Sequence, residues 1–177
     1  MGELSRAEVR RILDERVEQL VALWPDIPGT PLDEIISFHL EREGLHFVAE
    51  EDDEGCLAGI AYGYLGAPGQ WWHDRVAEEM TDEQRRRWLR PGHFELVELA
   101  VRPDLRGQGI GTRLHDAVLA GLSAPAVLST QVDNHAALCL YTNRGWETVV
   151  PEIDFPVGSY CVMGREAPSA VAERVVA

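Results

Sequence analysis

The sequence has few cysteines, and they are not placed to form a disulfide framework or a zinc site. Only three occur in 177 residues: Cys56, Cys139 and Cys161. An odd number of widely spaced thiols argues against a disulfide-stabilised secreted protein and indicates a reducing compartment. There is also no CxxC pair or His/Cys cluster with the spacing of a zinc site. We therefore expect a cytoplasmic protein that binds no metal.

The chain also lacks a long apolar run and an excess of positive charge. Apolar stretches stay well short of the ~18 residues of a membrane span, and the polar start MGELSRAEVRR has no signal-peptide core. Thirty acidic residues against sixteen basic ones give a net charge of −14. Nucleic acid and anionic membranes repel such a chain, so we expect neither as a partner. A cationic or neutral partner is easier to attract.

The pattern that is present is that of one α/β domain over residues 1–177, with an insert at 66–92 and a tail at 166–177. Helical periodicity predicts helices over 6–24, 31–44, 71–80, 81–89, 110–122 and 134–144. Apolar and β-branched runs predict strands over 45–50, 56–66, 93–101, 126–132, 145–150 and 159–166.

The stretch LRGQGIGT, residues 105–112, lies between a predicted strand and a predicted helix. Such a turn presents backbone N–H groups at the positive end of the helix, where they hold an anion such as a phosphate. It has no lysine for a Walker loop. Its GxGxG spacing and the absence of an acid ~20 residues later do not fit a dinucleotide fingerprint. A plain strand-to-helix turn remains the alternative.

Two longer stretches carry a family resemblance. LAVRPDLRGQGIGTRLHDAVL resembles the central motif of the GNAT superfamily of acyl-CoA-dependent N-acyltransferases, and NHAALCLYTNRGWETV resembles its C-terminal motif. The matching residues are Leu99, Val101, Pro103, Arg106, Gly109 and Gly111 in the first motif, and Asn134, Ala137, Tyr141 and Gly145 in the second, where Trp146 replaces the usual phenylalanine. The resemblance covers residues 93–150 and extends less specifically back to residue 45.

The resemblance implies a mixed, mostly antiparallel central sheet flanked by helices, with the helical insert before the central strand. It implies acetyl-CoA as cosubstrate, with a bulge in strand 93–101 that frees backbone groups for the pantetheine arm. The implied coenzyme contacts are Leu99, Ala100 and Val101 on the strand, Arg106, Gly107, Gln108, Gly109, Ile110, Gly111 and Thr112 at the pyrophosphate, and Asn134, Ala137 and Tyr141 on the later helix. Asn134 equally fits a role as a helix cap alone.

The implied reaction is direct transfer of an acetyl group from acetyl-CoA to a primary amine of a small molecule or peptide. Tyr141 matches the family's general acid, although a core tyrosine on an amphipathic helix is the alternative. The Val101 N–H is the implied oxyanion donor. The base is Glu98, Glu95 or water, with Glu98 favoured. In a regular strand the two glutamates face opposite sides, so we expect one of them at the acceptor site. The competing function is a non-catalytic acyl-CoA-binding regulator.

The acceptor side is less informative. In the family the first two helices and the last hairpin wall the acceptor site, which here implicates residues around WPDIPGT and EIDFPVGS. Their acids Asp26, Glu152 and Asp154 would attract a cationic amine, or are polar loop surface. The sequence does not select the amine.

The tryptophans of the insert, Trp71, Trp72 and Trp88, fit a buried satellite core, a lid or a homodimer contact. We expect His93, His115 and His135 to be surface or core residues, and Cys139 to be buried. The family usually has a strand before its first helix, which here is missing or supplied by the tail.

Overall fold

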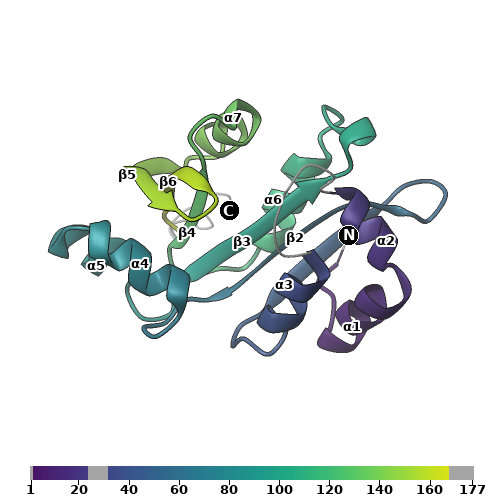
Figure 1. Cartoon of the computed structure of the whole chain (residues 1–177), viewed down its shortest axis with the longest axis horizontal. Coiled ribbons are helices and arrows are strands. Elements are labelled where there is room, and N and C mark those ends of the chain that lie inside the picture. The colour runs from purple at the N-terminus through teal and green to yellow at the C-terminus, as the bar shows by residue number, and fades with distance from the viewer. Residues whose placement is uncertain (1, 24–31, 168–177) are drawn as a thin grey trace, which may run out of the picture. The chain divides into compact units, whose positions relative to one another are not determined.

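The computed structural model describes residues 2–23 and 32–167, which fall into two compact units (Figure 1). The first unit comprises residues 1–65 and 95–120, and the second comprises residues 66–94 and 121–177. The helices are α1 (Arg6–Glu15), α2 (Val17–Leu23), α3 (Leu32–His39), α4 (Trp71–Glu79), α5 (Asp82–Trp88), the 3-10 helix η1 (Pro103–Leu105), α6 (Ile110–Val118) and α7 (His135–Asn143). Within the described residues, every helix is too short or too polar to cross a membrane.

The strands confirm the predicted fold class of a mixed, mostly antiparallel sheet flanked by helices. They are β1 (His46–Glu51), β2 (Leu57–Leu65), β3 (Phe94–Val101), β4 (Ala126–Gln131), β5 (Glu147–Phe155) and β6 (Gly158–Arg165), in the order β1-β2-β3-β4-β6-β5. The pairs β1–β2, β4–β6 and β5–β6 are antiparallel.

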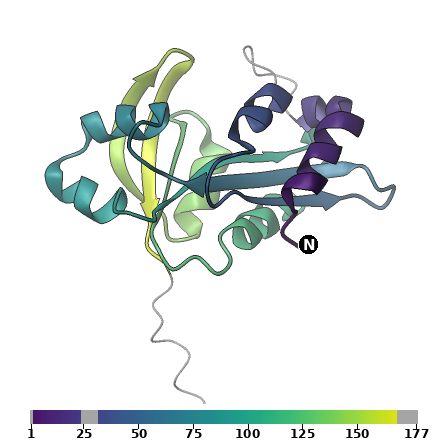
Figure 2. The ribbon, with the colours of Figure 1, turned by 90° about the horizontal axis from the view of Figure 1, so that it is seen from below.

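In the first unit, helices cover both faces of the strands (Figure 2). A Cβ built on Gly59 of β2 would lie 2.8 Å from Leu114 of α6, so this side of β2 faces α6. Because side chains alternate along a strand, Ile60 and Tyr62 face the other side. There they share a buried core with residues of α1, α2 and α3, including Val9, Leu20 and Ile36.

The single helix predicted over 6–24 is wrong, because the structure breaks it in two at Arg16. Arg16 ends α1 with φ −132° and ψ 23°. Its guanidinium donates to the Gly55 carbonyl oxygen at 2.5 Å and pairs with Glu51 of β1. The side chain thus ties the break to the β1–β2 hairpin. Trp24 lies outside the described residues.

In place of the first strand that the family usually has, residues before α1 form a short pairing with β1. Glu3 forms an isolated antiparallel bridge with Val48 of β1, and the Leu4 N–H donates to the Phe47 carbonyl at 2.8 Å. These residues cover part of the β1 edge before α1 begins. The predicted alternative, a strand from the tail, concerns residues that are largely outside the described part of the chain.

In the second unit, the insert helices α4 and α5 contribute to the core. Val76, Met80 and Trp88 are buried with residues of β4, β5 and β6. A Cβ built on Gly164 would lie 2.6 Å from the Trp88 ring, so only glycine leaves room for that indole. Trp72 donates from Nε1 to Ser129 Oγ at 2.9 Å. The structure therefore supports the buried-core interpretation for Trp88.

Candidate active site

The glycine turn between β3 and α6 has the backbone conformation that an anion-binding turn needs. Gly107 and Gly109 have φ values of +78° and +79°, a region that side chains with a Cβ disfavour. Gly109 starts α6 without a side-chain cap. The first N–H groups of α6 therefore have no partner inside the helix. A Cβ on Gly107 would meet nothing within 4 Å, so the turn is open above this glycine.

Two arginine side chains donate hydrogen bonds to carbonyl groups in and beside the turn. Arg106 donates from Nε to the Val101 carbonyl at 3.1 Å. Arg113 donates to the Gln108 carbonyl at 3.2 Å, and its guanidinium also pairs with Glu50 of β1. These contacts hold the turn against the end of β3 and connect it to β1.

Strand β3 contains a β-bulge, as two independent observations show. The Gly66 N–H donates to the His93 carbonyl, and the Arg102 N–H donates to the Ala58 carbonyl. Between these bonds β3 advances nine residues while β2 advances eight. Furthermore, Val97 and Ala100 pack against the same core although they are three residues apart. One extra residue in β3 explains both facts.

The bulge overturns the prediction that Glu95 and Glu98 face opposite sides. Glu95 precedes Val97 by two residues and Glu98 precedes Ala100 by two, so both carboxylates face the side covered by α1, α2 and α3. The extra residue between them reverses the alternation that a regular strand would have.

The pKa of Glu98, the favoured candidate for the base, is perturbed by its surroundings. Burial raises the pKa of its carboxyl well above the usual value, opposed by a hydrogen bond from the Leu99 N–H to Oε1 at 3.1 Å. The Leu99 N–H, which the resemblance assigns to the pantetheine arm, is thus directed to Glu98. A carboxyl whose pKa is raised toward neutrality is a stronger base once it is ionised.

A histidine that the sequence analysis missed lies on the same face. The Nδ1 of His39, at the end of α3, is 3.1 Å from the hydroxyl of Tyr62, and its Nε2 is 3.4 Å from that of Tyr64. Burial and then Arg42 lower the pKa of His39 to about 4. Burial and then Glu98 raise the pKa of Tyr62. The alternation of Tyr62 and Tyr64 on β2 is the signal that could have indicated this group.

The second motif forms α7 in the second unit. The Asn134 side chain accepts a hydrogen bond from the Ala137 N–H at 3.1 Å, so Asn134 does cap the helix. Tyr141 is the buried residue of this helix, with its ring 5.6 Å from that of Trp146. Cys139 is exposed, which corrects the prediction that it is buried. It lies two residues from Tyr141 and so on another face of the helix.

Comparison with known families decides the classification. The sequence model of the acetyltransferase (GNAT) family matches residues 9–146. The chain belongs to the GNAT family. This confirms the resemblance that the two motifs carry, and extends it to the first helices.

Individual GNAT relatives agree with this assignment. The chain is 32% identical over 130 residues to the GCN5-like protein acetyltransferase Rv2170 of Mycobacterium tuberculosis, a match that covers 68% of this chain and 63% of that protein. It is 40% identical over 72 residues to a mycothiol acetyltransferase of a Nocardioides species, covering 37% of this chain and 24% of that one. The chain thus spans less than two thirds of the length of these curated relatives.

Solved GNAT structures share the fold. One is Naa20 of Chaetomium thermophilum in complex with a bisubstrate analogue, with a TM-score of 0.61 and 15% sequence identity. The match covers 99% of this chain and 90% of the Naa20 chain. An aminoglycoside 6'-N-acetyltransferase complexed with coenzyme A has a TM-score of 0.61 at 16% identity, covering 94% and 97%. At these identities the likeness concerns the fold alone.

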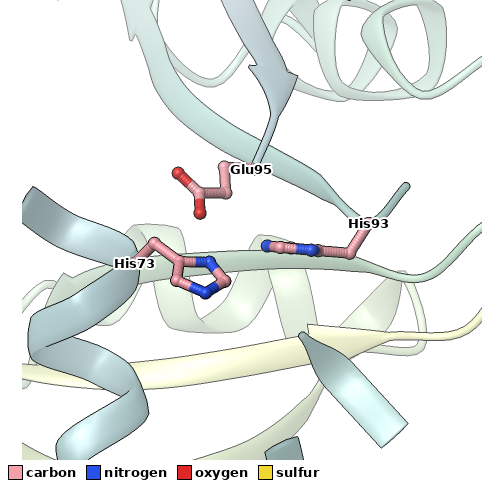
Figure 3. A group of neighbouring side chains, drawn as sticks. All are labelled: His73, His93 and Glu95. Atoms are coloured by element: carbon pink, nitrogen blue, oxygen red, sulfur yellow. The ribbon is translucent and has the colours of Figure 1, made fainter. Parts of the chain in front are cut away.

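The other histidines of this GNAT chain are mostly structural. His93 and His115 are buried, and His135 is exposed. The rings of His73 and His93 lie 5.1 Å apart, and Figure 3 shows them with Glu95. Imidazoles and a carboxylate are donors that transition metals accept, so these are the described side chains that suit a metal best. That the protein binds no metal stays a prediction.

The predicted acceptor residues are only partly described. Asp26 and the rest of WPDIPGT lie outside the described residues. Glu152 and Asp154 are exposed on β5, and Asp154 accepts a hydrogen bond from Ser159 Oγ at 2.6 Å. Trp71 is 63% exposed, with its ring 5.5 Å from Phe155. The hairpin therefore combines acid with aromatic surface, as its sequence predicts.

Proposed function

We propose that this protein transfers an acetyl group from acetyl-CoA directly to a primary amine. The observation that carries the proposal is the turn after β3. Two left-handed glycines lead there into a helix that starts without a side-chain cap, directly after a bulged strand. Backbone N–H groups of residues 106–112 would bind the pyrophosphate, because the helix dipole and the open surface above Gly107 suit an anion.

Two residues are the predicted proton-transfer groups. In the first unit, Glu98 accepts the proton of the acceptor ammonium, directly or through water, and its raised pKa makes the ionised carboxylate a stronger base. The Val101 N–H donates to the oxyanion, as in the family. In the second unit, Tyr141 donates a proton to the departing thiolate. A phenol of reference pKa ~10 carries that proton at pH 7.

The experiment is a screen of small amines, amino acids and peptides for thiol release from acetyl-CoA, combined with a calorimetric titration of coenzyme A. The chain has no lysine, so acetylation of its own lysine side chains cannot produce a signal. Turnover with at least one amine supports the proposal. Coenzyme binding without turnover on any amine would instead favour the acyl-CoA-binding regulator.

The cysteines, which form no disulfide with one another, support a cytoplasmic location. Cys56, Cys139 and Cys161 are all free thiols. Free thiols persist in a reducing compartment. Acetyl-CoA chemistry in the same compartment is consistent with this proposal.

A further inference from the structure

Arg42 lies in the turn after α3, with its guanidinium beside two aromatic rings. The guanidinium carbon is 5.2 Å from the ring centroid of Phe38 and 5.7 Å from that of Tyr64. Phe38 is 71% exposed, whereas Tyr64 is buried on β2. The Arg42 backbone carbonyl accepts a hydrogen bond from Arg6 at 2.9 Å, which holds the turn in place. Stacking orders the guanidinium plane and leaves its N–H edge for a planar anion.

Arg42 forms no ion pair with a described carboxylate, unlike seven other arginines of this acidic chain. Seven arginines form ion pairs with acidic side chains: Arg10, Arg16, Arg75, Arg85, Arg87, Arg102 and Arg113. Among residues 2–23 and 32–167, no carboxylate lies within ion-pair distance of Arg42. A half-buried cation with no ion-pair partner in the described part of the chain is suited to bind an external anion.

A line of neutral side chains connects Arg42 with the predicted base. Tyr64 contacts both Arg42 and His39, and His39 contacts Tyr62. Because the pKa of His39 is lowered to about 4 and that of Tyr64 is raised to about 12, both are uncharged at pH 7. Tyr62 in turn is close enough to Glu98 for the carboxylate charge to raise the pKa of its hydroxyl. The face thus has a cation at one end and the predicted base at the other.

We propose that Arg42 binds an acidic group of the acceptor, so that the preferred acceptor is a small zwitterion with an amine and a carboxylate, such as an amino acid. This inference rests on the proposed acetyl transfer. The amine would approach Glu98 while the carboxylate contacts the guanidinium edge. A zwitterion carries no net charge, so the net charge of −14 does not repel it. The carboxylate of Glu95 also acts on this face and repels an anion, and the charge of Arg42 would offset that repulsion.

The test compares each amino acid as its free acid with the same amino acid as its carboxamide, using thiol release from acetyl-CoA. The wild type should prefer a free acid by about 10- to 100-fold in kcat/KM, the size of a hydrogen-bonded charge interaction. Arg42→Gln should lower kcat/KM for the free acid by a similar factor and leave the carboxamide nearly unchanged. Arg42→Lys should recover part of the preference, because a point charge replaces the planar fork.

The matched control is Arg10→Gln, which removes the same charge from an exposed pair with Glu41. It should keep the preference for the free acid. Thermal unfolding and coenzyme A affinity report whether each variant is folded. Equal turnover of acid and carboxamide, equal effects of Arg42→Gln on both, or the same effect from Arg10→Gln would overturn the inference and leave acetyl transfer standing. Absence of turnover on all amines, with coenzyme A bound, would overturn both.

Discussion

Two strand–turn–helix segments of this chain, β3 to α6 and β4 to α7, differ in the regularity of the strand and in how the helix start is capped. β4 pairs with β6 without a register shift, and α7 begins at Asn134, whose side chain satisfies a backbone N–H. β3 contains a bulge, and α6 begins at the left-handed Gly109 without a side-chain cap. A capped first turn needs no ligand, whereas an uncapped one leaves N–H groups for an anion. The difference agrees with the proposed function, in which α6 binds the phosphate and α7 supplies Tyr141.

The largest effect should come from removing the hydroxyl of α7. We expect Tyr141→Phe to lower kcat by about 10²- to 10⁴-fold, the usual contribution of a general acid. The phenylalanine ring can keep its place beside Trp146, so folding is preserved. Steady-state kinetics and a coenzyme A titration measure the two parameters separately. An equal loss of turnover and coenzyme affinity would show that Tyr141 is structural and would weaken the contrast between α6 and α7.

The partly buried carboxylate of Glu98 on the bulged strand should give the next effect. Glu98→Gln should lower turnover by about 10²-fold, because the amide cannot accept the proton. In the wild type, activity should rise with pH through the folded pKa of Glu98, which burial places above 4.5. The variant should lack this rise. A pH–rate profile of kcat/KM measures it, and an unchanged profile would assign the base to Glu95 or water.

The same substitution has a stability signature with a definite sign. Burial raises the folded pKa of Glu98, so between pH 4.5 and that pKa the folded state binds more protons than the unfolded one. The wild type should therefore lose stability as pH rises through this window, while Glu98→Gln should not. Chemical denaturation at several pH values measures the difference. A variant less stable than the wild type at high pH would contradict the burial of an ionisable carboxyl.

The glycine turn should control binding rather than chemistry. Gly107→Val places a β-branched residue at φ +78°, which it adopts only with strain. The turn must rearrange, and we expect coenzyme A affinity to fall by about 10- to 100-fold, as for the loss of one or two charge-assisted hydrogen bonds. The closest control is Gly55→Val in the β1–β2 turn, where φ is +77° and, as at Gly107, a Cβ meets nothing within 4 Å. The two variants should lose similar stability, and only Gly107→Val should lose coenzyme affinity. Loss of affinity in both would mean that strain alone explains the effect.

The sequence predicted the parts of this structure that local patterns encode. Strand β3, the glycine turn and α7 lie within a few residues of their predicted bounds, because apolar periodicity and punctuating glycines act locally. The break at Arg16 was missed, since it depends on contacts of that side chain with the distant β1–β2 hairpin. The faces of Glu95 and Glu98 were wrong, because the position of the bulge reverses the alternation between them.

The proposed acceptor face shows the same limit of sequence-based prediction. His39 and Arg42 are ordinary residues near a helix end in the sequence, and only packing of α3 on β2 brings them to Tyr62 and Tyr64. No short motif encodes a contact between segments more than twenty residues apart. The family motifs therefore predict the coenzyme side of the site, while acceptor recognition depends on tertiary structure.

The smallest effect should come from the cap of α7. Asn134→Ala removes the acceptor of the Ala137 N–H and should cost about 1 kcal/mol of unfolding free energy, the usual value of such a cap. The Asn134 side-chain oxygen is already used by the Ala137 N–H, so we do not expect it to bind coenzyme A. The coenzyme A affinity of Asn134→Ala should therefore differ from that of the wild type by less than about twofold. Denaturant unfolding and the coenzyme titration measure the two quantities, with Asn134→Ser as a control that keeps a capping oxygen. A large loss of affinity in both variants would assign Asn134 to the coenzyme. The contrast with α6 would then lie in the glycines alone, because both helix starts would contribute to the binding site.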